Sequence, residues 1–252
     1  MGIHILAIEK RNRFVKAIVL AAGIGSRLFP ITKDKPKALV EVQGKPLIQH
    51  QLEKLKNAGY TQVLINIHHF GDQLLAFFKE QDNFGLELLI SDEQNQLLDT
   101  GGALRKAADF IRGDEPVLIH NVDVLSNISL AEMLNAHRLT GALATLAIRK
   151  RETSRYLLFN KRNKLCAWEN VKTGERKGDW SEPNLSSAAF SGIHIISPEC
   201  ADLFPEKEAF SIIDFYLEII KTHCVSGYFH DESVWLDVGK PETLAEAEKL
   251  KL

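Results

Sequence analysis

The chain has 252 residues, of which 45% are hydrophobic and 25% are charged, and its formal net charge at pH 7 is -2. These values are typical of one large globular enzyme domain, and the balanced charge argues against a nucleic-acid partner, which would require a basic surface. The 3 cysteines are widely spaced without a CxxC pair, so the sequence favours neither a disulfide framework nor a zinc site and is typical of a cytoplasmic protein. No apolar run is long enough to cross a membrane. We expect a monomer or small homo-oligomer.

The first 150 residues alternate between buried strands and amphipathic helices. Residues 1–13 are expected to form a loosely held extension, and FVKAIVLA (14–21) is typical of a strand that is buried on both faces. Further strands are expected at 62–67, 86–90, 116–120 and 142–148, and helices at 46–59, 71–81, 100–111 (with Thr100 as the cap) and 129–139. This alternation predicts an α/β fold with a Rossmann-like, mixed and mostly parallel sheet flanked by helices.

The pattern changes after residue 150. Strands are expected at 156–160, 164–168 and 188–197, with an ordinary loop at 172–184. The rest of the chain predicts a helix at 211–221, strands at 227–230 and 234–239, and a helix at 241–252. We therefore expect a single domain, made of a core at 14–150, a smaller mixed lobe at 151–240 and a C-terminal helix at 241–252.

The stretch LAAGIGSRLFP (20–30) follows the first strand, where open α/β sheets commonly bind phosphate groups. Gly23 and Gly25 let the backbone approach a ligand closely and turn N–H groups toward an anion, and Arg27 adds a positive charge. A tight connection whose glycines only relieve backbone strain is an equal alternative. Leu28 stands where a dinucleotide fingerprint requires a third glycine, and the Gly-Lys-Ser/Thr of a P-loop is absent, so neither fingerprint is satisfied.

Several longer motifs resemble those of a known family. The segments LAAGIGSRLFPITKDKPKALVEVQGKPLIQH (20–50), DTGGAL (99–104), NVDV (121–124), FSGIHIISPE (190–199) and VWLDVGKPE (234–242) are similar to signatures of the sugar-1-phosphate nucleotidyltransferases. The resemblance covers nearly all of the chain after the extension and is greatest to short bacterial members that handle N-acetylmuramate 1-phosphate or mannose 1-phosphate. It implies a nucleotide-binding core at 14–150, a sugar-binding lobe with a metal strand at 151–240, and no appended acyltransferase domain.

The resemblance implies that two cations and the glycine loop hold a nucleoside triphosphate. An arginine fork and a lysine point charge suit phosphate oxygens, although solvated surface side chains are the alternative. The base is expected near residues 100–102, which open a helix, and Glu93 is equally consistent with an ordinary surface carboxylate. The implied nucleotide-binding residues are Leu20, Ala22, Gly23, Gly25, Ser26, Arg27, Lys37, Glu93, Thr100, Gly101 and Gly102.

Asp123 and Asp237 each follow an apolar strand. Carboxylates from two strand ends can hold one Mg²⁺, which prefers oxygen ligands, and the resemblance assigns them this role; a loop-capping aspartate is the alternative for each. Val122 replaces the glycine that usually precedes the first aspartate. For the sugar, the resemblance implies Asn121, Glu169, Ser191, Gly192 and Trp235, with Asn170 in place of the lysine that usually follows the glutamate; packing alone is the alternative.

The implied reaction is the formation of an NDP-sugar and pyrophosphate from an NTP and a sugar 1-phosphate. It needs Mg²⁺ and proceeds by in-line attack on the α-phosphorus, with Arg27, Lys37 and Asp123 as catalytic residues. Many guanylyl and thymidylyl members of the family have two glycines where this chain has Ala21-Ala22-Gly23, so the resemblance favours UTP. The substrates implied by the resemblance are therefore UTP and N-acetylmuramate 1-phosphate.

Three alternatives remain at this point. GTP with mannose 1-phosphate or heptose 1-phosphate would use the same site. A glycosyltransferase would be expected to carry a DxD motif, whereas here Val124-Leu125 follow the aspartate. A catalytically inactive nucleotide-sugar-binding module is the alternative outside the enzymes.

Overall fold

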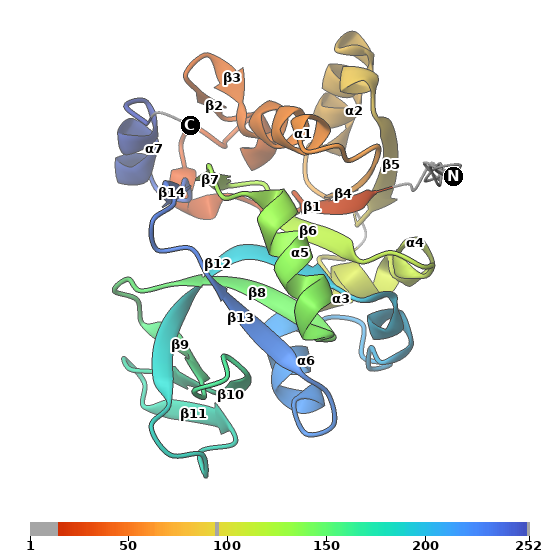
Figure 1. Cartoon of the computed structure of the whole chain (residues 1–252). Helices are drawn as coiled ribbons and strands as arrows, with labels where there is room; N and C mark the ends of the chain where they lie inside the picture. The colour runs from red at the N-terminus through yellow and green to blue at the C-terminus, as the bar shows by residue number, and fades with distance from the viewer. Residues whose placement is uncertain (1–14, 94–95, 251–252) are drawn as a thin grey trace, which may run out of the picture.

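The computed structural model describes residues 15–93 and 96–250, which form a mixed sheet with helices on both faces (Figure 1). Its parallel part has the spatial order β5 (Glu87–Asp92), β4 (Gln62–Ile67), β1 (Lys16–Leu20) and β6 (Val117–Asn121). The long strand β12 (Ser186–Ile196) then pairs antiparallel with β6 and with β8 (Ala144–Arg149), and β13 (Val225–Phe229) runs parallel to β8. The predicted α/β fold with a mixed sheet is confirmed.

The sheet is less parallel than the sequence suggested, because β12 pairs antiparallel with each of its neighbours and the strands beyond β9 also pair antiparallel. The first half of β12 pairs with β9 (Arg155–Phe159), and β10 (Leu165–Asn170) and β11 (Glu175–Gly178) follow outward. β11 lies inside the predicted loop 172–184, so that prediction was wrong there. Its four residues are all exposed, so the sequence shows no alternation of apolar and polar residues there. The segment is a strand because it pairs with β10.

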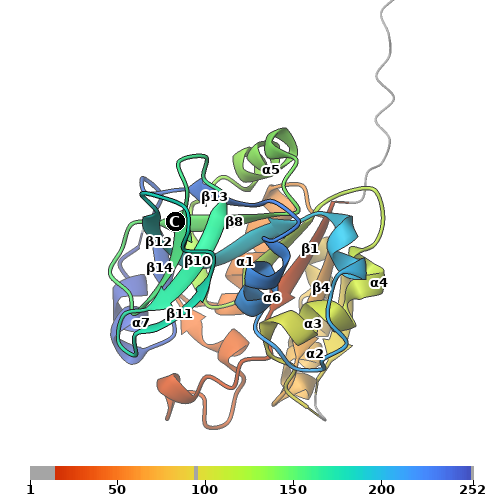
Figure 2. The same ribbon diagram turned by 90° about the horizontal axis from the view of Figure 1, so that it is seen from below.

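Alternating side chains of the sheet build two hydrophobic cores. Ala17 and Val19 of β1 pack into one core and Ile18 into the other, because successive side chains of a strand point to opposite faces. The first core contains side chains of α1 (Leu47–Asn57), α2 (Gly71–Glu80) and α5 (Leu130–Thr140), and the second those of α3 (Asp99–Lys106), α4 (Ala108–Ile111) and α6 (Ile212–Ile219). Figure 2 shows α3 and α6 beside each other in front of the sheet.

Several element boundaries differ from the sequence prediction. The helix expected at 100–111 divides at Ala107, and it begins at Asp99, so Thr100 is not its cap. The Thr100 hydroxyl instead accepts a hydrogen bond from the N–H of Ile212 at 3.0 Å. Pro46 pairs in a short hairpin, β2 (Glu41–Val42) and β3 (Lys45–Pro46), before α1 begins. The last helix, α7 (Pro241–Ala247), is shorter than predicted.

The expected extension 1–13 and residues 251–252 lie outside the described residues. The remaining short elements are the 3₁₀ turns η1 (Ser26–Leu28), η2 (Lys37–Leu39), η3 (Asp82–Gly85) and η4 (Pro198–Asp202) and the small sheet of β7 (Val124–Ser126) and β14 (Trp235–Asp237). Across the described ranges, no helix combines the length and the apolar character needed to cross a membrane.

Buried histidines should make the fold sensitive to acid. Burial lowers the pKa of His194 to about 3 from its ordinary 6.5, and both ring nitrogens lack a hydrogen-bond partner among the described residues. As the pH falls from 6.5 toward 3, the unfolded chain gains a proton that the folded chain does not bind. The free energy of unfolding should therefore fall by about 1.4 kcal/mol per pH unit for this histidine.

His194→Phe removes this titration and keeps an aromatic ring against Phe190 and Tyr216, whose ring centroids lie 5.5 and 5.7 Å away. We expect the variant to become increasingly more stable than the wild type as the pH falls below 6.5, in urea unfolding followed by circular dichroism. His69→Gln, at an exposed histidine, is the control. A stability difference that does not change with pH would show that His194 does not contribute to acid sensitivity.

Candidate active site

The site lies at the carboxyl ends of β1 and β6. These strands are parallel neighbours with Leu20 opposite Asn121, so the loops that follow them leave the sheet at the same edge. The buried side chain of Asn66, at the end of β4, accepts hydrogen bonds from the N–H groups of Ala21 and Ala22 at 2.6 and 3.3 Å. The neighbouring strand thus fixes the start of the glycine loop.

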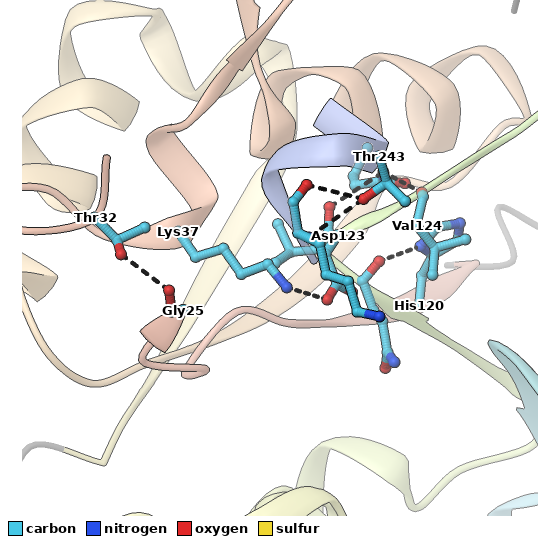
Figure 3. Close-up of polar contacts among 11 residues, drawn as sticks. Gly25, Thr32, Lys37, His120, Asp123, Val124 and Thr243 are labelled. Atoms are coloured by element: carbon cyan, nitrogen blue, oxygen red, sulfur yellow. Dashed lines mark hydrogen bonds and ion pairs between the residues drawn. The ribbon is translucent and has the colours of Figure 1, made fainter. Parts of the chain in front are cut away.

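Gly25 directs the glycine loop toward Lys37. It has a left-handed backbone with φ +71°, and an added Cβ would lie 3.0 Å from the Thr32 Cγ2 and 3.1 Å from the Lys37 Cβ, so only glycine fits here without strain. The Thr32 hydroxyl donates to the Gly25 carbonyl at 2.9 Å (Figure 3). At Gly23, by contrast, a Cβ would meet no described atom within 4 Å, because this residue faces open space.

Two strands bring the aspartates together. β14 pairs antiparallel with β7 so that Asp237 lies opposite Val124, and the N–H of Val238 donates to the Asp123 carbonyl at 2.8 Å. Residues more than a hundred positions apart in the sequence are therefore neighbours. Hydropathy did not reveal β7, since it is only three residues long.

The predicted cations reach the same two carboxylates. Lys37 is buried and its ammonium forms an ion pair with Asp123 Oδ2 (Figure 3). A Cβ placed on Gly239 would lie 2.7 Å from Asp237 Oδ1 and 2.9 Å from Arg27 Nη2. The Asp237 carboxylate and the Arg27 guanidinium therefore both lie close to Gly239. The structure thus brings Arg27, Lys37, Asp123 and Asp237 into one charged cluster, as the sequence predicts.

The pKa of the Asp237 carboxyl is shifted in the charged cluster. Burial raises its pKa, and the neighbouring Asp123 carboxylate raises it further, whereas Lys37, Arg27 and Arg151 act in the opposite direction. Its Oδ1 atom is buried and has no hydrogen-bond partner among the described residues. A buried carboxylate oxygen without a donor is unfavourable unless a cation binds it.

A cavity of about 380 Å³ opens beside Asp123. Eight of the predicted site residues line it, namely Leu20, Ala22, Gly23, Lys37, Glu93, Thr100, Asn121 and Asp123, together with Asn66, Leu97, Asp99 and Val122. Two larger hollows, of about 800 and 990 Å³, contain none of the predicted residues. The chemistry of the lining therefore distinguishes this cavity better than its size does.

Glu93 is not an exposed loop residue, which was one of the two interpretations of the sequence. Its side chain is buried, one oxygen accepts from the Asn66 amide at 2.8 Å and the other from the N–H of Leu98 at 3.2 Å. The carboxylate thus fixes the wall of the cavity.

Gly101 and Gly102 pack against the segment before α6 and are not among the residues that line the cavity. The N–H of Gly101 donates to the Phe210 carbonyl at 2.8 Å, and a Cβ on Gly102 would lie 2.1 Å from the Glu208 carbonyl oxygen. Their lack of side chains permits this close approach. The N–H of Gly101 therefore already has a partner.

Four of the five residues predicted for the sugar are neighbours. An added Cβ on Gly192 would lie 2.8 Å from the Asn121 amide nitrogen. The Trp235 indole donates to the Ser191 carbonyl at 2.9 Å, and the Ser191 hydroxyl bonds His230 at 2.7 Å. Glu169 lies on β10, where it pairs with Arg176 at 3.5 Å.

Gln51 is a positioning residue that the sequence analysis missed. It belongs to α1, is 2% exposed, and donates to the carbonyls of Val122 and Val124 at 3.4 and 2.7 Å, on either side of Asp123. One helix turn further on, Lys54 donates to the carbonyl and hydroxyl of Ser126. The sequence did carry a signal for this role, because Gln51 is the single polar residue on the buried face of the amphipathic helix α1.

Replacing Gln51 with leucine should loosen the segment that carries Asp123. The change leaves two carbonyl groups without their donor, so we expect a stability loss of about 1–3 kcal/mol, with a decrease in kcat of roughly tenfold or more as the carboxylate moves. Denaturant unfolding and steady-state kinetics measure both. Gln49→Leu is the matched control, because Gln49 bonds Glu53 of the same helix and no other side chain among the described residues. Equal kinetics of the two variants would refute the positioning role.

The chain is similar to known proteins over nearly all of its length. The sequence profile described as nucleotidyl transferase matches residues 16–252. The N-acetylmuramate alpha-1-phosphate uridylyltransferase of Caulobacter vibrioides is 31% identical over 92% of this chain and 95% of its own length. The probable mannose-1-phosphate guanylyltransferase 2 of Oryza sativa subsp. japonica is 32% identical over 90% of the chain, which spans only 62% of that relative.

Solved structures show the same fold at lower identity. A putative glucose-1-phosphate thymidylyltransferase from Bacillus anthracis aligns with a TM-score of 0.78 at 21% identity and covers 94% of this chain and 97% of its own. A UDP-glucose pyrophosphorylase in complex with UDP-glucose aligns with a TM-score of 0.75 at 19% identity, with the same coverage of both chains.

Proposed function

The chain belongs to the nucleotidyl transferase family and is a sugar-1-phosphate nucleotidyltransferase, and from this premise we propose that it joins UTP and N-acetylmuramate 1-phosphate into UDP-N-acetylmuramate with release of pyrophosphate. The observation that carries the choice of substrates is the similarity along nearly its full length to the Caulobacter uridylyltransferase. The rice relative supports GTP with mannose 1-phosphate as the second candidate.

In the proposed reaction, an oxygen of the sugar phosphate attacks the α-phosphorus of the NTP. A bond from that oxygen to the α-phosphorus forms, the bond to the bridging oxygen of the β-phosphate breaks, and pyrophosphate leaves. A phosphate monoester loses its second proton near pH 6, so its oxygen is already an anion at neutral pH and no general base is required. The work of the protein is then to position two anionic substrates and to stabilise the charge of the leaving group.

We assign the triphosphate to Arg27, Lys37 and the glycine loop. Arg27 is exposed on η1 and free to close on a ligand, while Lys37 begins η2 with its ammonium against Asp123. Leu20, Ala22, Gly23 and Lys37 line the cavity, and Arg27 lies beside Asp237 at its edge, which supports this assignment. For the nucleoside we propose the part of the cavity between Glu93 and Thr100.

The two aspartates fit a magnesium ion, which would neutralise phosphate charge when bound. Within residues 15–93 and 96–250, no group of three histidine, cysteine, aspartate or glutamate side chains is arranged to hold a metal. Mg²⁺ in nucleotide-dependent enzymes commonly takes one or two carboxylates and completes its shell with water and phosphate oxygens. The unpartnered Oδ1 of Asp237 beside Asp123 supports this assignment.

A substrate matrix tests the proposal. Each of the four common NTPs is mixed with the 1-phosphates of N-acetylmuramate, mannose, glucose, N-acetylglucosamine and heptose in the presence of Mg²⁺, and pyrophosphate release is measured. We expect the highest kcat/KM for UTP with N-acetylmuramate 1-phosphate. Preference for GTP with mannose 1-phosphate or heptose 1-phosphate would replace the substrates, whereas binding without release for every pair would indicate an inactive nucleotide-sugar-binding module.

A further inference from the structure

Three cations act on the half-buried Asp237, and one of them has no role in holding the NTP. Arg27 and Lys37 come from the segment after β1, whereas Arg151 follows β8 on the side of the sugar-binding residues. A reaction between two phosphate-bearing substrates brings a second group of negative charges to the same carboxylates. NTP binding therefore does not explain the position of Arg151.

The Arg151 guanidinium is held beside Trp235. Its central carbon lies 4.7 Å from the centroid of the indole ring, and its Nη2 donates to the Phe190 carbonyl at 3.1 Å. Trp235 precedes Asp237 by two residues on β14 and donates to the Ser191 carbonyl. Two fixed contacts thus place the positive fork between the residues proposed for the sugar and the carboxylate proposed for the metal.

The same guanidinium keeps unused hydrogen-bonding capacity. Its Nε is buried and has no partner among the described residues, and no acidic side chain in the described ranges forms an ion pair with it. Burying a charged donor without an acceptor is unfavourable, and a guanidinium suits the oxygens of a phosphate. An anionic ligand would satisfy this arginine.

We propose that Arg151 binds the phosphate of the sugar 1-phosphate and so selects phosphorylated sugars as acceptors. The inference rests on the proposed function and extends it to the attacking substrate. In-line transfer places the attacking oxygen opposite the leaving pyrophosphate, so a cation from a different part of the fold than Arg27 and Lys37 is suited to the attacking phosphate.

Arg149 provides a matched control. Its guanidinium carbon lies 5.7 Å from the same indole centroid and its Nη1 donates to the Ser233 carbonyl at 3.4 Å, but its charge is not among those that act on Asp237. The two arginines therefore share a tryptophan, and each has a buried Nε without a partner among the described residues. They differ in their electrostatic effect on Asp237, which only Arg151 shows.

The kinetic test compares wild type, Arg151→Gln, Arg151→Lys and Arg149→Gln with UTP and N-acetylmuramate 1-phosphate. For Arg151→Gln, the KM for the sugar 1-phosphate should rise roughly 10- to 100-fold, the loss expected for a charged hydrogen bond, with the KM for UTP nearly unchanged. Arg151→Lys should recover part of the loss, and Arg149→Gln should resemble the wild type. In the reverse direction, the KM should rise for UDP-N-acetylmuramate and not for pyrophosphate.

A binding measurement separates this inference from the proposed function. Calorimetric titration with N-acetylmuramate 1-phosphate and with unphosphorylated N-acetylmuramate needs no turnover. We expect the phosphate to strengthen binding to the wild type and to contribute little in Arg151→Gln, whose folding is checked by thermal unfolding; if it unfolds, Arg151→Lys carries the test. An equal gain from the phosphate in both proteins, or a rise in the KM for UTP instead, would overturn the assignment, whereas an inactive wild type would refute only the reaction.

Discussion

Replacing Asp123 with asparagine should lower kcat by at least roughly 100- to 1,000-fold while the protein stays folded. The amide keeps the shape of the side chain but removes the charge that pairs with Lys37 and that we assign to the metal. The side chain is 18% exposed, and the contact that Val238 makes is with the backbone of Asp123. The loss should therefore fall on the chemistry more than on the fold.

Pyrophosphate release and a thermal unfolding curve measure the two effects of Asp123→Asn. Asp109→Asn, at an exposed aspartate of α4 that pairs with Arg112, is the control and should behave as the wild type. Near-normal turnover of the Asp123 variant would contradict its assignment as a metal ligand. Equal losses of turnover and of folded protein would assign it a structural role.

Replacing Asp237 with asparagine should have opposite effects on turnover and on stability. Turnover should fall by a similar factor of roughly 100 to 1,000, whereas the metal-free protein should become more stable. Burial and the nearby Asp123 raise the pKa of Asp237, so at neutral pH the folded chain holds a carboxylate that is more favourable in the unfolded chain. A neutral amide removes that penalty, and a gain on the order of 1 kcal/mol would raise Tm by about 2–4 °C in a chain of this size.

The sign of the Asp237 effect can be checked with pH. As the pH falls through the raised pKa, the wild-type carboxyl becomes neutral too, and the stability advantage of Asp237→Asn should shrink. The measurement is thermal unfolding in EDTA across the acid range, repeated with Mg²⁺ and UTP, which should stabilise only the wild type. A variant that is less stable in EDTA would show that Arg27, Lys37 and Arg151 outweigh the burial of the carboxylate.

The alternation of strands and helices could be predicted from the sequence, because the buried face of each element requires apolar residues at the spacing of a strand or a helix. β1, β4 and β6 are covered on both faces and read as apolar runs. β11 could not be found in this way, since its exposed residues carry no pattern. The hairpin of β2 and β3 has only two residues on each side, which is too short to leave a periodic pattern in the sequence.

The charged cluster was predicted residue by residue, but its geometry was not. Asp123 and Asp237 follow recognisable strands, whereas the pairing of β7 with β14 that unites them is only three residues long on each side. Gly101 and Gly102 match the family motif, and the structure shows that their small size serves the packing of α3 against the chain before α6. The role of Gln51 could not be predicted, because it depends on the Val122 and Val124 carbonyls lying next to α1 in the folded chain.

The central claim is that Asp123 and Asp237 together hold the divalent ion of the bound nucleotide. The most direct measurement is Mn²⁺ binding, with Mn²⁺ in place of Mg²⁺, followed by electron paramagnetic resonance in the presence of a nonhydrolysable UTP analogue. The account predicts one tightly bound ion per wild-type chain and a strong loss of affinity in both Asp123→Asn and Asp237→Asn, with none in Asp109→Asn. Unchanged binding in the two site variants would contradict it.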